Sequence, residues 1–336
     1  MSLRIIRPGL LTTVQDLGRL GYQQNGIIVS GAMDVPALRV ANLLVGNANN
    51  AAGLEITLRG PKIHFTADHL IALTGAHLSP TLNGEPLGLH RPVWVAAGTE
   101  LAFGAPMAGS RAYLAVAGGV VVPEVLGSRA TYLRAGFGGL HGRALLAGDA
   151  LPIGEPSAVS QLTARALREK PSDKSWTPAC WTPGPDLCPT PRLNPTVRAI
   201  RGPEYHWFSS ASQRDFWRQP FTVTSEADRM GYRLHGPDLE RRTKAELLSS
   251  AVTFGTVQVP AGGQAIVLMA DHQTTGGYPR LAQVITADFS ALAQVRPGQV
   301  IRFQEVSLAE AQALYLAQER QLLALRRGIE TIFGNK

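Results

Sequence analysis

The chain has little charge and almost no cysteine. Charged residues make up 17% of its 336 residues, against roughly 25% in an average soluble protein. The two cysteines, Cys180 and Cys188, share one proline-rich stretch without a histidine at zinc-finger spacing, which excludes a disulfide scaffold and disfavours a zinc site. The longest apolar run, around residues 113–122, is too short to span a bilayer, and the N-terminus lacks a signal-peptide core. We therefore expect a cytoplasmic protein with no membrane segment and no metal ion.

The chain also lacks the pattern of a nucleic-acid-binding protein, although it is basic. Its 32 lysine and arginine residues against 25 acidic residues give a formal net charge of +7. The arginines are scattered, and no basic run alternates with aromatic residues. We interpret the charge as a solvated basic surface that attracts anionic substrates or partners, and we expect no nucleic-acid partner.

Glycine and proline are abundant, and they indicate many short strands. The chain has 35 glycines and 23 prolines, which exclude a coiled coil and most helix bundles, while a hydrophobic content of 45% excludes a disordered chain. Turn signals recur about every 8 to 12 residues from residue 54 onward, and residues 81–84 predict a hairpin with a type I′ turn. One early helix is expected after Asp34 as N-cap, with Pro36 in its first turn and Gly46 at its end.

The order of segments predicts two β-rich domains in tandem. Residues 155–195 are rich in proline and predict a linker or surface excursion, with a helical patch at residues 158–168. Short strings of the first part recur about 200 residues later, for example GTELAF at residue 98 and GQVIRF at residue 298. We therefore predict domains at residues 1–154 and 196–336, with the Pro-rich segment at 155–195 between them. A capping box at residues 307–310 predicts a C-terminal helix.

No standard catalytic signature is present, since the chain has no Walker A loop, no G-x-S-x-G and no H-E-x-x-H. Three polar strings nevertheless interrupt the apolar strands, at residues 12–19, 30–34 and 271–280. Each has a plain structural interpretation, as an ion pair, a helix cap or a turn. The third string favours function, because it follows a buried run and opens into a loop. The first string favours neither the functional nor the structural interpretation. In the second string, the structural interpretation as a helix cap is stronger than the functional one.

Several single residues have two interpretations each. Arg229 and Arg233 flank Met230-Gly231-Tyr232 and are explained equally by a structural ion pair or an anion clamp. Glu55 lies in an alternating strand, where a lone carboxylate is more typical of the surface than of catalysis. His272 is in the third polar string, and we expect a solvent-facing or turn role for it.

The polar strings resemble a known family. The strings PGLLTTVQDLGR at residue 8, SGAMD at residue 30 and ANLLVGN at residue 41 are similar to the opening of the biotin-dependent carboxyltransferase subdomain family, also called allophanate hydrolase subunit 2 or KipA-like. The resemblance continues through AYLAVAGG at residue 112, RMGYRL at residue 229 and DHQTTGGYP at residue 271, so that nearly the whole chain outside 155–195 is covered. One departure is Ala130, where the family usually has serine after Gly-Ser-Arg.

The resemblance implies a mainly β fold of two tandem cyclophilin-like β-barrel domains with a few helices. It also implies a subunit of an ATP-dependent 5-oxoprolinase, which opens the lactam of 5-oxo-L-proline to give L-glutamate. The implied partners are two further subunits, one KipI-like and one LamB/YcsF-like, and we expect the chain to be inactive without them. The implied cofactor is ATP with Mg²⁺ as its usual counter-ion, and no covalent cofactor is expected. Two alternatives stay open: a regulatory protein that antagonises a KipI-like kinase inhibitor, and the carboxyltransferase component of a biotin-dependent urea carboxylase.

The polar strings and the resemblance together give the candidate site. An unactivated amide is a poor electrophile, so ATP is expected to phosphorylate the lactam oxygen before water attacks, and such a site needs cations or N–H donors for phosphate. The candidate catalytic groups are Asp16, Asp271, Gln273 and Thr274. The candidates for binding substrate or phosphate are Arg19, Ser30, Arg229, Arg233, Gly276 and Gly277.

Overall fold

The computed structural model describes residues 2–243, 245 and 247–334. By their internal contacts these residues fall into two compact units. Unit 1 comprises Met1–Gly18, Asp34–Pro191 and Arg320–Lys336, and unit 2 comprises Arg19–Met33 and Arg192–Glu319. This division differs from the predicted one because it assigns residues 19–33 to the second unit and most of the proline-rich segment to the first.

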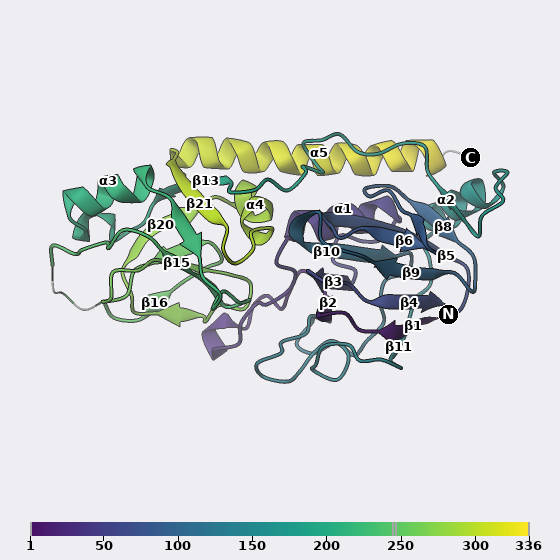
Figure 1. Cartoon of the computed structure of the whole chain (residues 1–336), viewed down its shortest axis with the longest axis horizontal. Coiled ribbons are helices and arrows are strands. Elements are labelled where there is room, and N and C mark those ends of the chain that lie inside the picture. Colours follow the sequence, from purple (N-terminus) through teal and green to yellow (C-terminus); the bar gives the residue numbers. More distant parts are fainter. Residues whose placement is uncertain (1, 244, 246, 335–336) are drawn as a thin grey trace. The chain divides into compact units, whose positions relative to one another are not determined.

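Unit 1 is built from two antiparallel sheets, each of six strands within the described residues. The first sheet has the order β11-β1-β4-β9-β6-β7 and the second the order β12-β8-β5-β10-β3-β2 (Figure 1). The strands are β1 (Ser2–Arg7), β2 (Leu11–Gln15), β3 (Gly53–Thr57), β4 (Lys62–Phe65), β5 (His69–His77), β6 (Pro80–Leu82), β7 (Glu85–Pro86), β8 (Val93–Val95), β9 (Glu100–Phe103), β10 (Ala108–Val116), β11 (Ala150–Pro152) and β12 (Trp176–Pro178).

Alternating apolar side chains from both sheets form one core of unit 1. Leu3 and Ile5 of β1, Ile63 and Phe65 of β4, and Leu114 of β10 are all fully buried in the same cluster. Side chains of β strands alternate between faces, so the other face of the second sheet is free to pack elsewhere. Helices α1 (Val35–Leu44) and α2 (Ala158–Arg168) contribute to a second apolar cluster with residues of β5, β10 and the last part of the chain.

Local capping signals confirm the predicted helix and turn positions in unit 1. The Asp34 side chain accepts a hydrogen bond from the Ala37 N–H at the start of α1. The predicted helical patch at residues 158–168 is α2, with the Ser157 side chain as its N-cap. The type I′ turn is confirmed by the positive φ angles of Asn83 (49°) and Gly84 (86°) between the paired strands β6 and β7.

Unit 2 is a closed barrel of the order β13-β20-β17-β18-β15-β14-β21. Its pairs are antiparallel except for β13 with β21, which is parallel. The strands are β13 (Thr196–Arg201), β14 (Phe221–Val223), β15 (Gly231–His235), β16 (Ser250–Ala251), β17 (Thr256–Gln258), β18 (Ile266–Leu268), β19 (Thr275–Gly276), β20 (Arg280–Val284) and β21 (Val300–Glu305). The short pair β16–β19 lies outside the barrel order. Apolar side chains from the barrel strands fill the interior together with Met33, which the segment 19–33 supplies.

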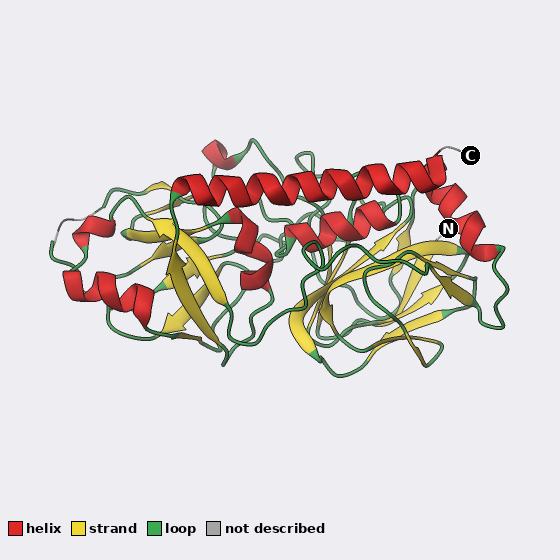
Figure 2. Ribbon diagram, turned by 90° about the horizontal axis from the view of Figure 1, so that it is seen from above, coloured by secondary structure: helices red, strands yellow, loops and turns green. Residues whose placement is uncertain are grey.

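Helices accompany the strands of both units, and Figure 2 draws them in red. Unit 2 carries α3 (Ser210–Arg218), α4 (Phe289–Ala293) and the 3-10 turns η1 (Gln23–Asn25), η2 (Tyr205–Trp207) and η3 (Thr286–Asp288). The C-terminal helix α5 (Leu308–Gly334) begins in unit 2 and ends in unit 1. Its predicted capping box is confirmed, because the Ser307 N–H donates to Glu310 Oε2 at 2.7 Å and the Glu310 N–H donates to Ser307 Oγ at 3.2 Å.

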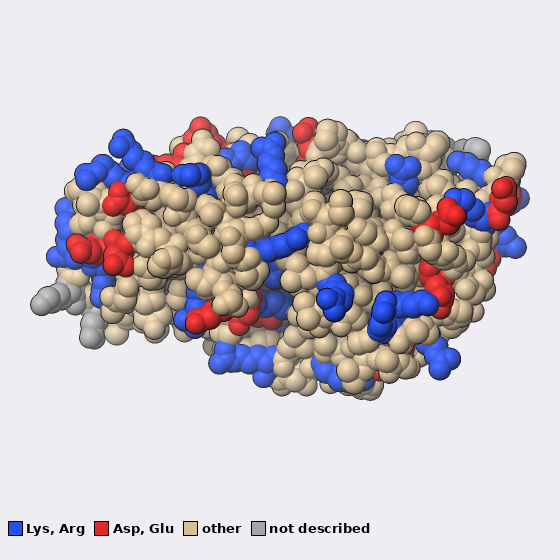
Figure 3. Space-filling view, in the orientation of Figure 1, with Lys and Arg blue, Asp and Glu red and all other residues tan. Residues whose placement is uncertain are grey.

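The mainly β prediction, with a few helices and a terminal helix, is therefore confirmed. Among the residues that the structure describes, no helix is both long and apolar enough to cross a membrane. Lysine and arginine residues lie interspersed with acidic ones over the face drawn in Figure 3. Cys180 and Cys188 are both free thiols, and burial raises the pKa of Cys188 to about 12.

Candidate functional site

The third polar string begins at a buried ion pair in unit 2. Asp271 lies three residues after the end of β18, and its Oδ2 accepts a hydrogen bond from Arg229 Nε at 2.9 Å. Its Oδ1 accepts from Ser30 Oγ at 2.7 Å and from Arg229 Nη2 at 3.1 Å. The Arg229 and Asp271 side chains are only 8% and 6% exposed. Three residues that were predicted as site residues from separate parts of the sequence are thus brought together.

Strand pairing explains why these residues meet. Strand β15 begins two residues after Arg229, and it pairs antiparallel with β18, which ends three residues before Asp271. The ladder continues past both ends, since the Asp271 N–H donates to the Arg229 carbonyl oxygen at 2.7 Å. The two side chains therefore start from neighbouring backbone positions and form a bidentate ion pair, which is the strong geometry for an arginine and a carboxylate.

The arrangement makes Asp271 an anchor for charge rather than an available base. Both carboxylate oxygens of Asp271 accept hydrogen bonds, and Oδ1 accepts from both the Ser30 hydroxyl and the Arg229 guanidinium. Arg229 Nη2 also donates to the Gly31 carbonyl oxygen, so Asp271 and Arg229 together hold residues 30 and 31. Ser30 has a φ of 56°, which is strained for a residue with a Cβ, and these bonds offset the strain.

His272 is more buried than the sequence predicted. Its side chain lies in the turn after β18 and only 7% of the residue is exposed, so the expected solvent-facing position is wrong while the turn position is right. Nδ1 lies 2.6 Å from the Gln273 carbonyl oxygen, which fixes Nδ1 as the protonated nitrogen and Nε2 as the acceptor. Burial lowers the pKa of His272, so the imidazole is neutral near pH 7.

The loop after His272 carries the remaining residues of the third string. Gln273 and Thr274 are half-buried, and Gly276 forms β19 against β16. A Cβ on Gly276 would lie 2.6 Å from Gln258 Nε2, and a Cβ on Gly277 would lie 3.2 Å from the Leu247 carbonyl oxygen. A side chain at position 276 would therefore require the Gln258 amide to move. A phosphate-binding role for either glycine stays a prediction.

The predicted anion-binding arginines occupy different environments within unit 2. Arg19 is fully buried, and its backbone N–H donates to the Val29 carbonyl oxygen at 2.8 Å. Arg233 lies on the surface, where its Nε is 3.1 Å from Glu226 Oε2 and both side chains are at least 60% exposed. The structure thus groups Arg229 with Asp271 and leaves Arg233 outside that cluster.

Asp16 organises a loop in unit 1. Its Oδ1 accepts from the Gly18 N–H at 2.8 Å and from Ser128 Oγ at 2.7 Å, and its Oδ2 accepts from the Arg129 N–H. Ser128 Oγ in turn accepts from the Ala130 N–H at 3.0 Å. Ala130 is fully buried at the position where the family usually has serine, and the hydroxyl that caps this turn belongs to Ser128.

A second buried polar group in unit 1 was also missed. Glu55 is 2% exposed, so its expected surface position is wrong, and its Oε2 accepts from Tyr113 OH at 2.7 Å. The same phenol oxygen accepts from the Asp34 N–H at 2.7 Å, at the start of α1. Burial, followed by the nearby Glu55 charge, raises the pKa of Tyr113 well above its usual value. Thr13 and Thr74 complete a polar row across four paired strands, β2, β3, β10 and β5.

No group of three or more histidine, cysteine or acidic residues within the described residues has the arrangement of a metal site. Two cavities of about 370 and 450 Å³ lie in units 1 and 2, and no predicted site residue is among the residues that line them.

Comparison with known proteins shows the family. Residues 25–305 match the family described as carboxyltransferase domain, subdomain A and B. The chain is 46% identical to the 5-oxoprolinase C-subunit of Escherichia coli K12 over 318 residues, covering 95% of this chain and 96% of that protein. It is 42% identical to the 5-oxoprolinase C-subunit of Haemophilus influenzae, with the same coverage.

A solved structure gives the same fold. The urea carboxylase of Kluyveromyces lactis matches with a TM-score of 0.86 and 29% identity, covering 98% of this chain and 29% of that protein. The chain therefore belongs to the carboxyltransferase domain A and B family, as its polar strings indicated.

Proposed function

We propose that this chain is a subunit of an ATP-dependent 5-oxoprolinase that converts 5-oxo-L-proline to L-glutamate. The observation that carries the proposal is the 46% identity to the C-subunit of a 5-oxoprolinase along nearly the whole length of both proteins. Identity over nearly the whole length of both chains argues for the same role more strongly than a shared domain inside a longer protein does. The proposed partners are two further subunits, one KipI-like and one LamB/YcsF-like, and the proposed location is the cytoplasm.

The proposed reaction begins with activation of the lactam. The lactam oxygen attacks the γ-phosphorus of ATP, ADP leaves, and an O-phosphorylated imidate forms. Water then adds to the imidate carbon, the ring C–N bond breaks, and a second water releases phosphate to leave glutamate. The site must supply positive charge for phosphate and an acceptor for the protons of the attacking water.

The buried cluster in unit 2 supports a division of roles. His272 is the proposed proton acceptor, because its imidazole is neutral and its Nδ1 bond to the Gln273 carbonyl leaves Nε2 as the acceptor. Asp271 is proposed to hold Arg229 and Ser30 in position, since both of its oxygens are already engaged. Gln273 and Thr274 follow on the same loop and are proposed to bind the lactam amide. Mg²⁺ is expected to arrive with ATP.

A carboxyltransferase role is the second candidate. The similarity in fold to a urea carboxylase, with a TM-score of 0.86, favours it. The identity is lower, at 29%, and the chain corresponds to only 29% of that protein. A carboxyltransferase would require a biotinylated carrier, which the 5-oxoprolinase reaction does not.

Reconstitution with purified partner chains tests the proposal. The full chain, a KipI-like chain and a LamB/YcsF-like chain are combined with ATP, and glutamate and ADP are measured with and without 5-oxoproline. We expect ATP turnover that depends on 5-oxoproline and on all three chains. Tight binding to the KipI-like chain without turnover would favour the regulatory alternative, and a requirement for biotinylated protein would favour the carboxyltransferase.

Variants in the same assay test the residue roles. His272→Gln is expected to lower kcat by about 10²–10⁴-fold and to remove the acidic limb of the pH–rate profile. Asp271→Ala is expected to abolish turnover by releasing Arg229. Arg214→Gln, an exposed change on α3, is the control and is expected to leave turnover unchanged. Unchanged turnover in His272→Gln or Asp271→Ala would remove that residue from the site.

A further inference from the structure

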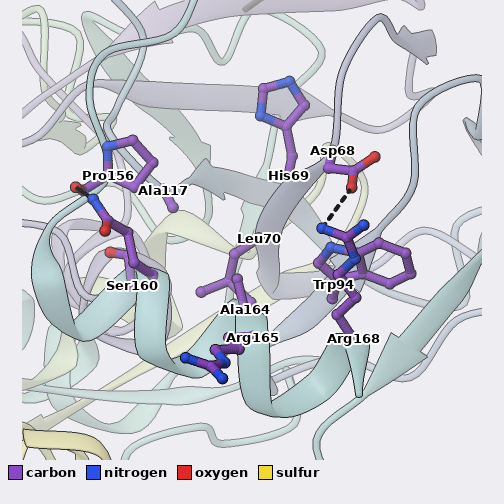
Figure 4. Close-up of a pocket in the computed structure, with 11 residues that line it drawn as sticks. Asp68, His69, Leu70, Trp94, Ala117, Pro156, Ser160, Ala164, Arg165 and Arg168 are labelled. Carbon is purple, nitrogen blue, oxygen red and sulfur yellow. Dashed lines mark hydrogen bonds and ion pairs between the residues drawn. The ribbon is translucent and has the colours of Figure 1, made fainter. Parts of the chain in front are cut away.

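A cavity in unit 1 lies between helix α2 and strands β5 and β8, apart from every residue of the candidate site. Its volume is about 370 Å³, within the range of roughly 300–1,000 Å³ typical of small-molecule sites. One face of α2 lines it through Ser160, Gln161, Ala164, Arg165 and Arg168, and Figure 4 shows this helix facing Leu70 and Trp94.

Apolar side chains form much of the floor of this cavity. Leu70 and Ala117 are 2% and 3% exposed and belong to the apolar cluster beneath the helices. Trp94 and Ala164 are half-buried and pack against the same cluster. A ligand with an apolar ring could therefore leave water and contact the Trp94 indole and the aliphatic carbons of the floor. Burial of apolar surface of this kind is the main source of affinity in such sites.

The two polar side chains that α2 places in the upper part of the lining, Ser160 and Gln161, are already hydrogen-bonded. Ser160 Oγ donates to the Val45 carbonyl oxygen at 2.6 Å. Gln161 Nε2 donates to the Pro156 carbonyl oxygen at 3.0 Å. Among the described residues, the Nε2 of the lining residue His69 is buried and has no hydrogen-bond partner. The cavity therefore suits an apolar body with few polar atoms rather than a ligand rich in donors and acceptors.

The rim of the cavity carries two guanidinium groups. The Arg165 and Arg168 side chains are 76% and 68% exposed. Arg165 uses Nε for an exposed pair with Glu169 at 2.8 Å, and Arg168 Nη1 is 3.9 Å from Asp68 Oδ2, beyond hydrogen-bonding distance. Asp68 Oδ1 accepts from the Ala97 N–H at 2.9 Å. Each arginine thus has one carboxylate near it, Glu169 or Asp68. A guanidinium has five N–H donors, so both arginines can still donate to an added anionic group at this rim.

We propose that this cavity binds a small aromatic carboxylate, with its ring on the floor beside Trp94 and its carboxylate at Arg165 and Arg168. The proposal is independent of the proposed 5-oxoprolinase function, since the cavity contains none of the residues placed in that reaction. The cavity in unit 2 gives a contrast, because Phe254 and Phe289 line it and the lining contains no charged side chain. Binding there would show no preference for a carboxylate.

Calorimetric titration of the full chain tests the site with two matched probes. Indole-3-carboxylate and the uncharged indole-3-carboxamide have the same ring and nearly the same shape. We expect the carboxylate to bind about tenfold more tightly, and the difference to shrink with added salt. The double variant Arg165→Gln/Arg168→Gln should bind both probes equally, whereas Arg214→Gln/Arg218→Gln on α3 should keep the preference. Equal affinity of the unmodified chain for both probes, or no binding at millimolar concentration, would overturn the proposal.

A second pair of variants locates the binding. Ala164→Leu adds bulk to the floor, and Gln161→Trp covers the mouth from an exposed position that does not affect the core. Each is expected to reduce the affinity for both probes at least tenfold while the melting temperature stays within a few degrees of the parent. If Ala164→Leu unfolds the protein, Gln161→Trp alone decides. Undiminished binding in a folded variant would place the probe elsewhere and refute the site.

Discussion

The buried pair of Arg229 and Asp271 gives the sharpest prediction about unit 2. Asp271→Ala removes two bonds from a guanidinium whose side chain is 8% exposed and one acceptor from the Ser30 hydroxyl. Breaking a buried ion pair by removing one partner costs about 3–5 kcal/mol, because the remaining charge is left without compensation. We expect the free energy of opening of β15 and β18 to fall by about this amount.

Hydrogen–deuterium exchange measured on peptides of β15 and β18 reports this local opening directly. A loss of about 3–5 kcal/mol corresponds to exchange that is faster by roughly two to four orders of magnitude, and strands of unit 1 should be unaffected. The double variant Arg229→Met/Asp271→Leu should recover much of the loss, because replacing both charges with apolar groups removes the uncompensated charge.

An exposed pair in the same unit is the matched control. Glu226→Ala breaks the Arg233–Glu226 contact, whose side chains are 60% and 70% exposed. Exposed pairs of this kind contribute about 0–1 kcal/mol, so exchange should change little. If Asp271→Ala and Glu226→Ala had equally small effects, or if the double variant were destabilised by the sum of its single changes, the buried pair would not be the anchor inferred here.

Two further predictions concern unit 1. Tyr113→Phe removes the hydroxyl that donates to Glu55 and accepts from the Asp34 N–H, and it should destabilise the unit by about 1–3 kcal/mol in urea titration, whereas Tyr132→Phe should change it by less than about 0.5 kcal/mol. Burial lowers the pKa of His90 to about 4, so the unfolded chain binds a proton below about pH 6.5 that the folded chain does not accept until near pH 4. The free energy of unfolding should therefore fall by up to about 3 kcal/mol as the pH is lowered from about 6.5 to about 4. The variant His90→Asn, in which asparagine suits the positive φ of 60°, should lose less stability over the same pH range.

Features that depend on a few neighbouring residues could be predicted from the sequence. The N-cap at Asp34, the turn at Asn83-Gly84 and the capping box of Ser307 with Glu310 each satisfy backbone groups within four positions. Such features depend on local hydrogen bonds and on the sign of φ. The residue type indicates which side chains can make these bonds and which residues favour a positive φ. The mainly β class followed in the same way from the spacing of turn signals.

The association of Ser30 with Asp271 is different, since the two residues are 241 positions apart. Both were predicted as site residues, but a single sequence contains no information that joins them. The segment 19–33 packs with the second barrel although its neighbours on both sides belong to the first unit. Composition and turn spacing change little across that segment, so the predicted boundary near residue 196 could not include it.

Glu55 shows where alternation misleads. An alternating strand with one carboxylate usually has that carboxylate in water, because an edge or half-exposed sheet has one polar face. Strand β3 instead lies between β10 and β2, and helix α1 packs on strands of the same sheet. Glu55 lies opposite Tyr113 on the neighbouring strand β10 and opposite Thr13 on the neighbouring strand β2. Its polar neighbours are therefore side chains of adjacent strands and not water. A buried carboxylate of this kind is stable only with such partners, and they become visible only when the strand order is known.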